Sequence, residues 1–316
     1  MNITHNTSSC FFIVARNAIF LVLILIILFP VPISAKKHKA SEEEPIEDKS
    51  KKKPGWLEEL LDMKLPKTQR MGELEISINP RLDDIVRRDY IRLPLHMKYG
   101  MTPNWELSFR LNDFLVNPFR GDDRSGISDV SFGTKYQWKK YPVPYVDTAT
   151  DFSVQIPTDN KAYISDRYTH YQPQIIFSKI FPQWNEVQLS FAINLDILSS
   201  YSENVEDPNR TSRYDALGLV FGVLYPATSR GYSLEAHWVT TEIDGGNKNT
   251  VYLLPGFFWF IPQKKYLKFP GTMRFALGLR IGINDTEDDF AFIARLNWDL
   301  PIKKQAKKYL EEKRSR

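Results

Sequence analysis

Charged side chains recur at alternate positions of segments that are otherwise apolar. In residues 272–284 the charges fall on Arg274 and Arg280, and the positions that alternate with them carry Met, Phe, Leu or Ile. A face of this kind can do electrostatic chemistry: its acids and bases either pair with one another or line a path that selects a solute by charge. Our candidates for such an enclosed, charged face are Arg92, Lys98, Glu106, Arg110, Asp151, Glu186, Asp196, Glu235, Arg274, Arg280 and Arg295.

The sequence lacks the residue spacing of the catalytic motifs that we considered. An outer-membrane phospholipase uses a His-x-Ser pair, whereas His96, His170 and His237 are followed two positions later by Lys, Gln and Val. The sequence contains no Gly-x-Ser-x-Gly or Walker-type loop, and its His and Cys residues lack the spacing of metal ligands. We therefore predict that the protein is not an enzyme and that it has no cofactor and no metal site.

The elements that must position the charges are β-strands. Residues 186–197 alternate polar and apolar side chains without exception. Successive side chains of a strand point to opposite faces, so this segment has one wet and one oily face. The pattern recurs in segments of about ten residues separated by turn-rich breaks, which is the signature of a transmembrane β-barrel.

The composition agrees with a barrel and excludes other classes. The 316 residues are 42% hydrophobic, 25% charged and 13% aromatic, with a mean hydropathy of −0.36. A bundle of membrane-spanning helices would need about 20 mostly apolar residues for each helix. The net charge of +4 comes from 42 basic and 38 acidic residues without a concentrated basic face, so no nucleic-acid partner is expected.

The fold class that we predict is all-β, an antiparallel transmembrane β-barrel of about twelve strands. Twelve is even, as single-chain bacterial barrels require. Pro94, Pro157, Pro173 and Pro255 fall within or at the edges of strands, so each is expected to mark a bulge or a strand end. The expected strands are residues 72–79, 90–99, 104–112, 127–138, 148–157, 170–181, 186–198, 213–225, 231–242, 250–262, 272–284 and 289–299.

The connections predict how the barrel is oriented. Every second connection between strands is mostly shorter and basic, and the connections between them are mostly longer and acidic. Because bacterial barrels have short turns on the periplasmic side, the shorter set is assigned to the periplasm. Trp105, Trp138, Trp184 and Trp298 lie near strand ends on that same side, at the depth that interfacial rings prefer. The turns assigned to the periplasm are residues 101–103, 139–147, 182–185, 226–230 and 263–271.

Two readings of the charged interior remain open. The acids and bases pair across strands and close the lumen, or they line a path and set its charge preference. The arginines among the candidates would favour an anionic solute if they were unpaired. Residues 250–262 are apolar on both faces. Their inner face is either packed by the N-terminal segment or an aromatic layer, or it forms a path for a hydrophobic ligand.

The chain divides into four predicted parts. Residues 1–35 have the apolar run and the small residue Ala35 of a signal peptide, with an uncleaved anchor as the alternative, and Cys10 would leave with it. Residues 36–69 are a charged, disordered linker followed by a short periplasmic helix at 56–63 that lies against or plugs the barrel mouth, or is a frayed leader. Residues 70–300 are the outer-membrane barrel, and residues 301–316 are a basic periplasmic tail.

One stretch resembles a known family. Residues 126–138, Gly-Ile-Ser-Asp-Val-Ser-Phe-Gly-Thr-Lys-Tyr-Gln-Trp, resemble the Gly-x-Gly-Asp-x-x-x-Gly-x-Lys-Tyr signature of the MetA-pathway phenol-degradation-type outer-membrane transporter family, with Ser128 at the second Gly. Residues 99–107 look like the strand–turn–strand that precedes it. The resemblance covers residues from about 70 to 299. It implies an outer-membrane barrel with an uptake or export role, and it carries over no site residues.

These observations predict a porin-like barrel in the outer membrane of a bacterial cell. Its expected partners are the lipid bilayer and a small solute, with a hydrophobic or aromatic solute as one option. The alternatives are a closed structural or adhesive barrel that binds a partner through acidic outer loops, and a soluble β-sandwich binding module. The sequence does not predict the oligomeric state.

Overall fold

The computed structural model describes residues 57–83, 90–116, 126–138, 145–158, 168–200, 215–227, 229–244, 248–261, 271–284 and 290–302. The predicted signal peptide, most of the linker with Trp56, and nearly all of the C-terminal tail lie outside them. The strands are β1 (Leu74–Ile78), β2 (Arg81–Asp83), β3 (Tyr90–Arg92), β4 (Leu95–Thr102), β5 (Trp105–Val116), β6 (Gly126–Trp138), β7 (Asp147–Pro157), β8 (Tyr168–Phe181), β9 (Val187–Ser200), β10 (Ala216–Pro226), β11 (Arg230–Thr240), β12 (Asn249–Ile261), β13 (Thr272–Gly282) and β14 (Phe290–Leu300).

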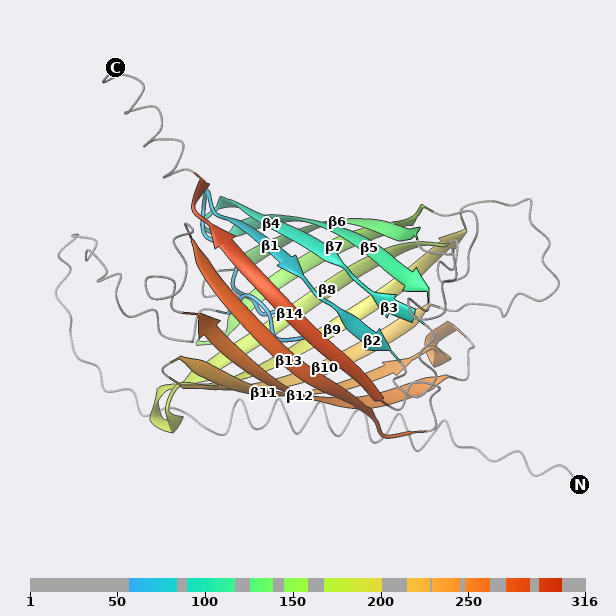
Figure 1. Cartoon of the computed structure of the whole chain (residues 1–316). Helices are drawn as coiled ribbons and strands as arrows, with labels where there is room; N and C mark the ends of the chain where they lie inside the picture. The colour runs from blue at the N-terminus through green and yellow to red at the C-terminus, as the bar shows by residue number, and fades with distance from the viewer. Residues whose placement is uncertain are drawn as a thin grey trace, which may run out of the picture. The chain divides into compact units, whose positions relative to one another are not determined.

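The strands form one antiparallel sheet that closes into a barrel with tilted strands (Figure 1). Closure comes from the pairing of β1 and β2 with β14, so the first and last strands are neighbours. The connections in the described part include two short 3-10 helices, η1 (Pro182–Trp184) and η2 (Glu242–Asp244). All twelve predicted strands are present, and their ends agree to within about four residues.

Fourteen segments make twelve barrel strands because two prolines interrupt the first two. β1 and β2 share one register on β14, from Leu74↔Leu300 to Leu82↔Phe292, and Asn79-Pro80 separates them. β3 and β4 likewise share one register on β5 across Pro94. Proline has no N–H to donate to the hydrogen bonds between strands, so strand pairing stops at each of these prolines and resumes after it.

The other prolines behave in two ways. Pro157 ends β7, as predicted. Pro173 and Pro255 instead lie inside strands and produce no bulge. The β8–β9 ladder skips from Tyr171↔Ile197 to Gln174↔Asn194 without a change of register, while Pro173 still pairs with Phe152 on β7. The missing N–H of an internal proline points to one neighbour only, so only that ladder is interrupted.

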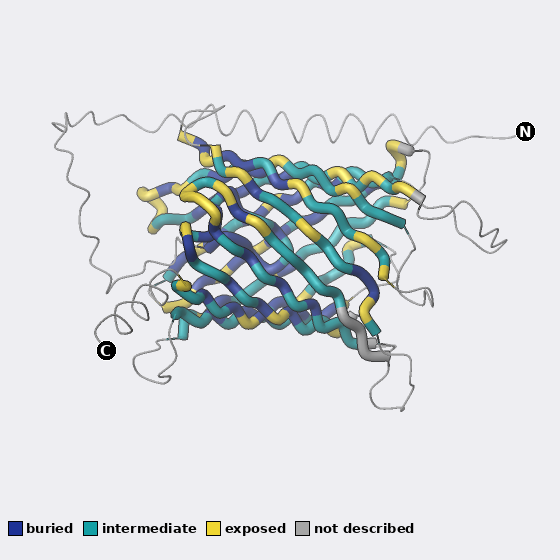
Figure 2. Tube along the Cα trace, turned by 90° about the horizontal axis from the view of Figure 1, so that it is seen from above, coloured by how far each residue is buried: buried dark blue, intermediate teal, exposed yellow. Residues whose placement is uncertain are grey.

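Buried residues alternate with more exposed ones along the strands of the barrel (Figure 2). Along β14 every second residue from Ala291 to Asp299 is buried, and the residues between them are half-buried or exposed. Large apolar side chains such as Ile175 and Phe132 are exposed on the outside, at 45% and 54%. Hydrocarbon around the barrel is the environment in which such a surface is stable. The described residues include no helix that is long and apolar enough to span a membrane.

Aromatic residues lie at the end of the barrel that carries the short turns. Trp105 and Trp138 are exposed, and their indole N–H groups donate to the hydroxyls of Thr134 (2.6 Å) and Thr150 (3.2 Å) on neighbouring strands. Trp184 stacks on Phe181 with ring centroids 4.9 Å apart. Rings that are apolar on one side and hydrogen-bonded on the other suit a membrane interface, as the sequence predicted.

The facing of β8 gives a direct test of the barrel. Replacing Ile175 with Arg puts a charge on the lipid face near the middle of the strand, which costs about 2–4 kcal/mol in a bilayer. Gln174→Arg, one residue earlier, puts the same charge into the interior and is expected to be tolerated. Urea unfolding in lipid vesicles, followed by heat-modifiable gel mobility, measures both variants. Equal destabilisation by the two substitutions would contradict the assignment of faces.

Candidate functional site

Residues 57–71 lie inside the barrel, and we call them the plug. Glu59 and Lys64 form an antiparallel bridge, and the Leu60 N–H donates to the Met63 carbonyl at 2.8 Å, so the plug turns sharply at Leu60–Met63. It then returns to the short-turn end, where the Thr68 hydroxyl donates to the Pro103 carbonyl at 3.2 Å. The chain enters β1 through Gly72, whose positive φ of 74° is freely open only to glycine.

The helix expected over residues 56–63 is not formed in the described part of that segment, residues 57–63. Glu235 of β11 supplies the reason. Its carboxylate accepts the N–H of Leu61 at 2.8 Å and of Met63 at 2.7 Å, and the Asp62 N–H donates to both of its oxygens. A completely buried carboxylate that binds three successive amides stabilises this turn in place of a helix.

Apolar contacts fill the space between the plug and one side of the wall. Leu57, Leu60, Leu61, Met63 and Leu65 are at most 3% exposed. Burial of each such side chain contributes about 1.5–3 kcal/mol. Their partners on the inner face of the barrel are Ile176, Ala192, Val220, Leu224, Leu254, Phe258, Ala276 and Ile293. The doubly apolar segment 250–262 is explained, because its inward residues Leu254 and Phe258 pack against the plug.

Glycines on the inner face make room for the turn. A Cβ added at Gly222 of β10 would lie 2.7 Å from Met63 Sδ and 2.9 Å from Leu60 Cδ1, both of which are too close for real atoms. A Cβ added at Gly256 or at Gly278 would likewise lie too close to Leu61 Cδ1. By contrast, a Cβ at Gly218 on the same strand as Gly222 would meet only Asn194 and Val239 at ordinary contact distances.

Buried cations hold the first half of the plug. Arg295 of β14 donates to the Leu60 carbonyl at 2.8 Å and to the Leu61 carbonyl, and it pairs with Glu59 at 2.6 Å. Lys98 of β4 pairs with the same Glu59 at 2.8 Å and with Glu75 at 3.0 Å. Arg274 of β13 bridges Glu58 of the plug (2.9 Å), Asp299 (3.0 Å) and Glu75. These cations therefore have carboxylate partners and are not a free anion-selective lining.

A second set of ions holds the returning half. Lys64 pairs with Asp151 of β7 at 2.5 Å. Lys135 of β6 donates to the Lys67 carbonyl at 2.6 Å and pairs with Glu106 at 3.5 Å. Glu106 in turn accepts the Gln69 N–H at 2.5 Å. Removing one member of a buried ion pair costs about 3–5 kcal/mol, so these contacts specify where the plug docks.

The two acidic side chains nearest the turn stay ionised in the docked plug. Burial alone raises the pKa of Glu59, but the nearby Arg295 and Lys98 outweigh it and hold that pKa well below its ordinary value of 4.5. Burial also raises the pKa of Asp62, and the ion pair with Arg81 brings it below its ordinary value of 3.8. Opposite charges close to a carboxyl favour its charged form, and here they exceed the cost of desolvation.

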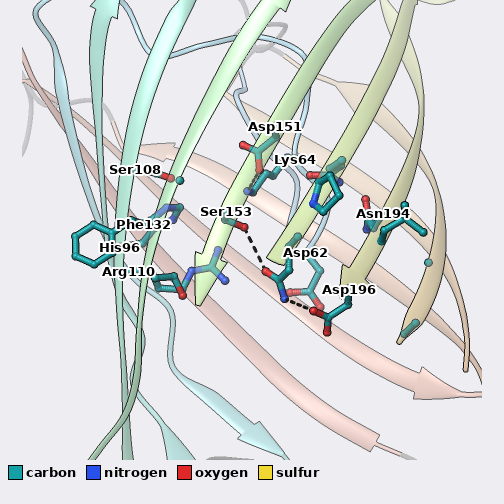
Figure 3. Close-up of a pocket in the computed structure, with 18 of the residues that line it drawn as sticks. Asp62, Lys64, His96, Ser108, Arg110, Phe132, Asp151, Ser153, Asn194 and Asp196 are labelled. Carbon is teal, nitrogen blue, oxygen red and sulfur yellow. Dashed lines mark hydrogen bonds and ion pairs between the residues drawn. The ribbon is translucent and has the colours of Figure 1, made fainter. Parts of the chain in front are cut away.

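Beyond the plug the interior contains a cavity of about 300 Å³ (Figure 3). Asp62 and Lys64 of the plug form part of its lining. The wall is mostly polar, with hydroxyls and amides between the charges. Ser153 donates to Gln172, which donates to Asp196, and Asp196 lies 2.9 Å from His170 Nδ1. The wall residues include His96, Ser108, Arg110, Ser131, Asp151, Ser153, Gln172, Gln174, Asn194, Asp196 and Gly218.

The eleven candidate residues fall into groups. Six contact the plug directly: Lys98, Glu106, Asp151, Glu235, Arg274 and Arg295. Arg110 and Asp196, together with Asp151, line the cavity. Arg280 lies over the Tyr252 ring, 5.5 Å from its centroid, and Arg92 lies in β3 opposite Arg81.

One candidate belongs to a turn and not to a strand. Glu186 precedes β9 in the turn that follows η1, and it has a positive φ of 64°, as does Asn185 at 55°. The alternation that begins at Glu186 in the sequence continues unbroken into β9, but the left-handed backbone at residues 185 and 186 starts the strand one residue later. Side-chain alternation alone carries no signal for that backbone change.

Sequence reasoning missed several residues of the cavity. Asp62 was placed in a short helix and Lys64 in the segment that follows it, whereas both line the cavity in the lumen. Gln172 and Gln174 of β8 also line it, and they continue the alternation of His170, a pattern that could have found them. No group of acidic, histidine or cysteine side chains suited to a metal ion occurs among the described residues.

A closed barrel with an apolar outer surface and an ionic interior defines the class of outer-membrane β-barrel proteins. Within that class the chain belongs to the family named for a MetA pathway of phenol degradation, which matches residues 96–300. The match includes both stretches that resembled this family in the sequence, and the predicted bacterial outer-membrane location is confirmed with it. A comparison with curated proteins finds no match.

Solved structures share the fold at low identity. An outer membrane channel from Pseudomonas putida F1 is similar with a TM-score of 0.50 and 10% identity, covering 74% of this chain and 97% of that one. The NanC porin has a TM-score of 0.46 and 12% identity, covering 71% and 97%. The KdgM porin has a TM-score of 0.45 and 8% identity, covering 71% and 98%. At such identities the first likeness supports the fold alone.

Glu235 is expected to control whether the plug stays docked. Glu235→Ala leaves three buried amides without an acceptor, at about 1–3 kcal/mol for each. The turn should then leave its seat, and trypsin should cut after Lys64 in the folded, detergent-solubilised protein. Glu242→Ala, on η2 away from the plug, is the control and should resist cleavage like the natural chain. Resistance of Lys64 in Glu235→Ala would show that this carboxylate does not hold the plug.

The docking of the plug should depend on pH in one direction. The docked pKa of Glu59 is lower than that of an exposed glutamate, so its contribution is complete above the undocked pKa and is lost as pH falls through the docked one. Conductance in planar bilayers should therefore stay constant from neutral pH to about pH 4.5 and rise below it. Glu59→Gln should flatten that rise, while Glu242→Gln should not. A rise that begins near pH 6 would contradict the assignment.

Proposed function

We propose that the protein is an outer-membrane channel for a small polar solute, closed by the plug and opened when the plug leaves its seat. The observation that carries this proposal is the polar cavity whose lining includes plug residues Asp62 and Lys64. Part of the lining is therefore a separate segment, docked by side-chain contacts, and not part of the barrel wall. The family membership and the fold shared with an outer membrane channel support the same function.

A polar solute fits the lumen better than a hydrophobic one. The apolar part of the inner face is occupied by the leucines and the methionine of the plug, at most 3% exposed, so it is a docking seat and not a path. The cavity that remains is lined mainly by hydroxyls, amides and charges, with Phe132, Pro173, Leu195, Ala216 and Val239 as the apolar part of its lining. Polar groups in a pocket fix the orientation and identity of a ligand, whereas a hydrocarbon would leave them unsatisfied.

A permanently closed barrel is the second candidate, because six of the eleven charged candidates bind the plug. In this reading the plug is a structural core, and the loops bind a partner. The two functions differ in what happens when the plug is displaced. That the protein is not an enzyme stays a prediction, and its oligomeric state stays open.

Gly222→Val tests the gate with a matched control. The added side chain occupies the space of Leu60 Cδ1 and Met63 Sδ and should displace the turn. At Gly218 the three atoms nearest to an added Cβ belong to Asn194 and Val239 of the wall, at 3.5–3.8 Å, so the same change should leave the plug docked. We expect Gly222→Val to conduct several-fold more than the natural chain in planar bilayers, and Gly218→Val to conduct no more. A folded Gly222→Val barrel that is cut at Lys64 and still does not conduct would favour the permanently closed barrel.

A further inference from the structure

We infer that the cavity binds the carboxylate of a small polar organic acid at Arg110. This inference rests on the proposed function and deepens it, since it names the solute class of the same lumen. Arg110 lies near the middle of β5, opposite His96 on β4 and Ser131 on β6. Its side chain points into the cavity, across from Asp196 on the far wall (Figure 3).

The acids of the cavity already have partners. Asp62 pairs with Arg81, Asp151 with Lys64 at 2.5 Å, and Asp196 lies 2.9 Å from His170 Nδ1. The guanidinium of Arg110 forms no hydrogen bond or ion pair with any residue in the described part of the chain. Arg110 is thus a cavity cation without a direct carboxylate partner among the described residues, although the charges of Glu59 and Asp62 act on it from a longer distance.

The groups around Arg110 complete a site for an oxyanion. A guanidinium presents two parallel N–H groups to a carboxylate, and this bidentate contact adds both strength and geometric specificity. Ser108 and Ser131 bring hydroxyl donors to the same wall, and Gln172 and Gln174 bring amides to the opposite wall. These groups can bind the hydroxyls of a polar body behind the carboxylate.

The size of the cavity limits the ligand. A volume of about 300 Å³ lies at the lower end of the range for small-molecule sites, which begins at about 300 Å³. The ligand is therefore a small acid with polar substituents, and not a long oligomer or a lipid. Arg274 and Arg295 were also candidate anion-binding residues in the sequence. They are excluded as partners of this ligand because they pair with Glu58 and Glu59 of the plug.

The test measures binding, so it does not need an open channel. D-gluconate is titrated into the full-length protein in detergent by calorimetry, with D-glucose as an uncharged probe of similar size and sodium chloride as an inorganic anion. We expect saturable binding of gluconate that neither other probe reproduces. Arg110→Gln should weaken it about 10- to 100-fold, the loss expected for a charge-assisted hydrogen-bonded contact. Arg230→Gln, which removes a charge from the exposed start of β11, should bind gluconate normally.

Arg110→Lys is the second variant, because it keeps the positive charge but cannot form the bidentate contact with a carboxylate. It should fold like the natural chain by heat-modifiable mobility and bind gluconate more weakly. Equal binding of glucose, no binding of gluconate, or unchanged binding in both Arg110 variants would overturn the site. Binding that depends on Arg110 in a barrel whose Gly222→Val variant does not conduct would instead overturn the channel and leave the site standing.

Discussion

Hydrocarbon can neither hydrogen-bond a backbone group nor solvate a charge, and this constraint organises the whole barrel. It closes the sheet, because an open edge would leave N–H and C=O groups unpaired. It also decides the facing of each strand, so that Ile175 and Phe132 meet lipid while Arg274 and Glu235 are enclosed. Pro173 and Pro255 show how strict the pairing is, since each of these internal prolines interrupts one ladder and leaves the other intact.

Enclosure creates a second problem that the plug solves. The inner wall combines ions with an apolar area around Leu254 and Phe258. The apolar area is unfavourable beside bulk water, and the ions are unfavourable beside a surface that buries them without partners. The plug is complementary to both. Its leucines cover the apolar area, Glu58 and Glu59 neutralise Arg274 and Arg295, and its turn amides satisfy Glu235. Apolar contacts give the docking its strength, and the directional contacts of the ions and amides give it one position.

The sequence predicted the barrel well because period-two alternation is a local signal that a lipid boundary enforces strand by strand. It located the charged interior for the same reason. It could not predict which charges meet, since Arg274 and Glu58 are 216 residues apart and pair only through the fold. The helix at 56–63 was wrong over its described part because helical spacing of Leu60, Leu61 and Met63 ignores a distant acceptor, Glu235, that binds the same amides. The inward glycines at 222, 256 and 278 were the available signal, because side chains are missing where another segment must fit.

Two residues belong to both the gate and the cavity, and this links the proposals. Asp62 and Lys64 are parts of the plug and also line the space that Arg110 faces. An anion bound at Arg110 would share that small volume with the Asp62 carboxylate, which repels it, and with the Lys64 ammonium, which attracts it, so the plug and the anion interact directly. The effect is reciprocal: the docked plug changes the binding free energy of the anion by the same amount as the bound anion changes the docking free energy of the plug. A solute of the inferred class would thus be coupled to the docking of the plug, with no conformational change required in the strands of the wall.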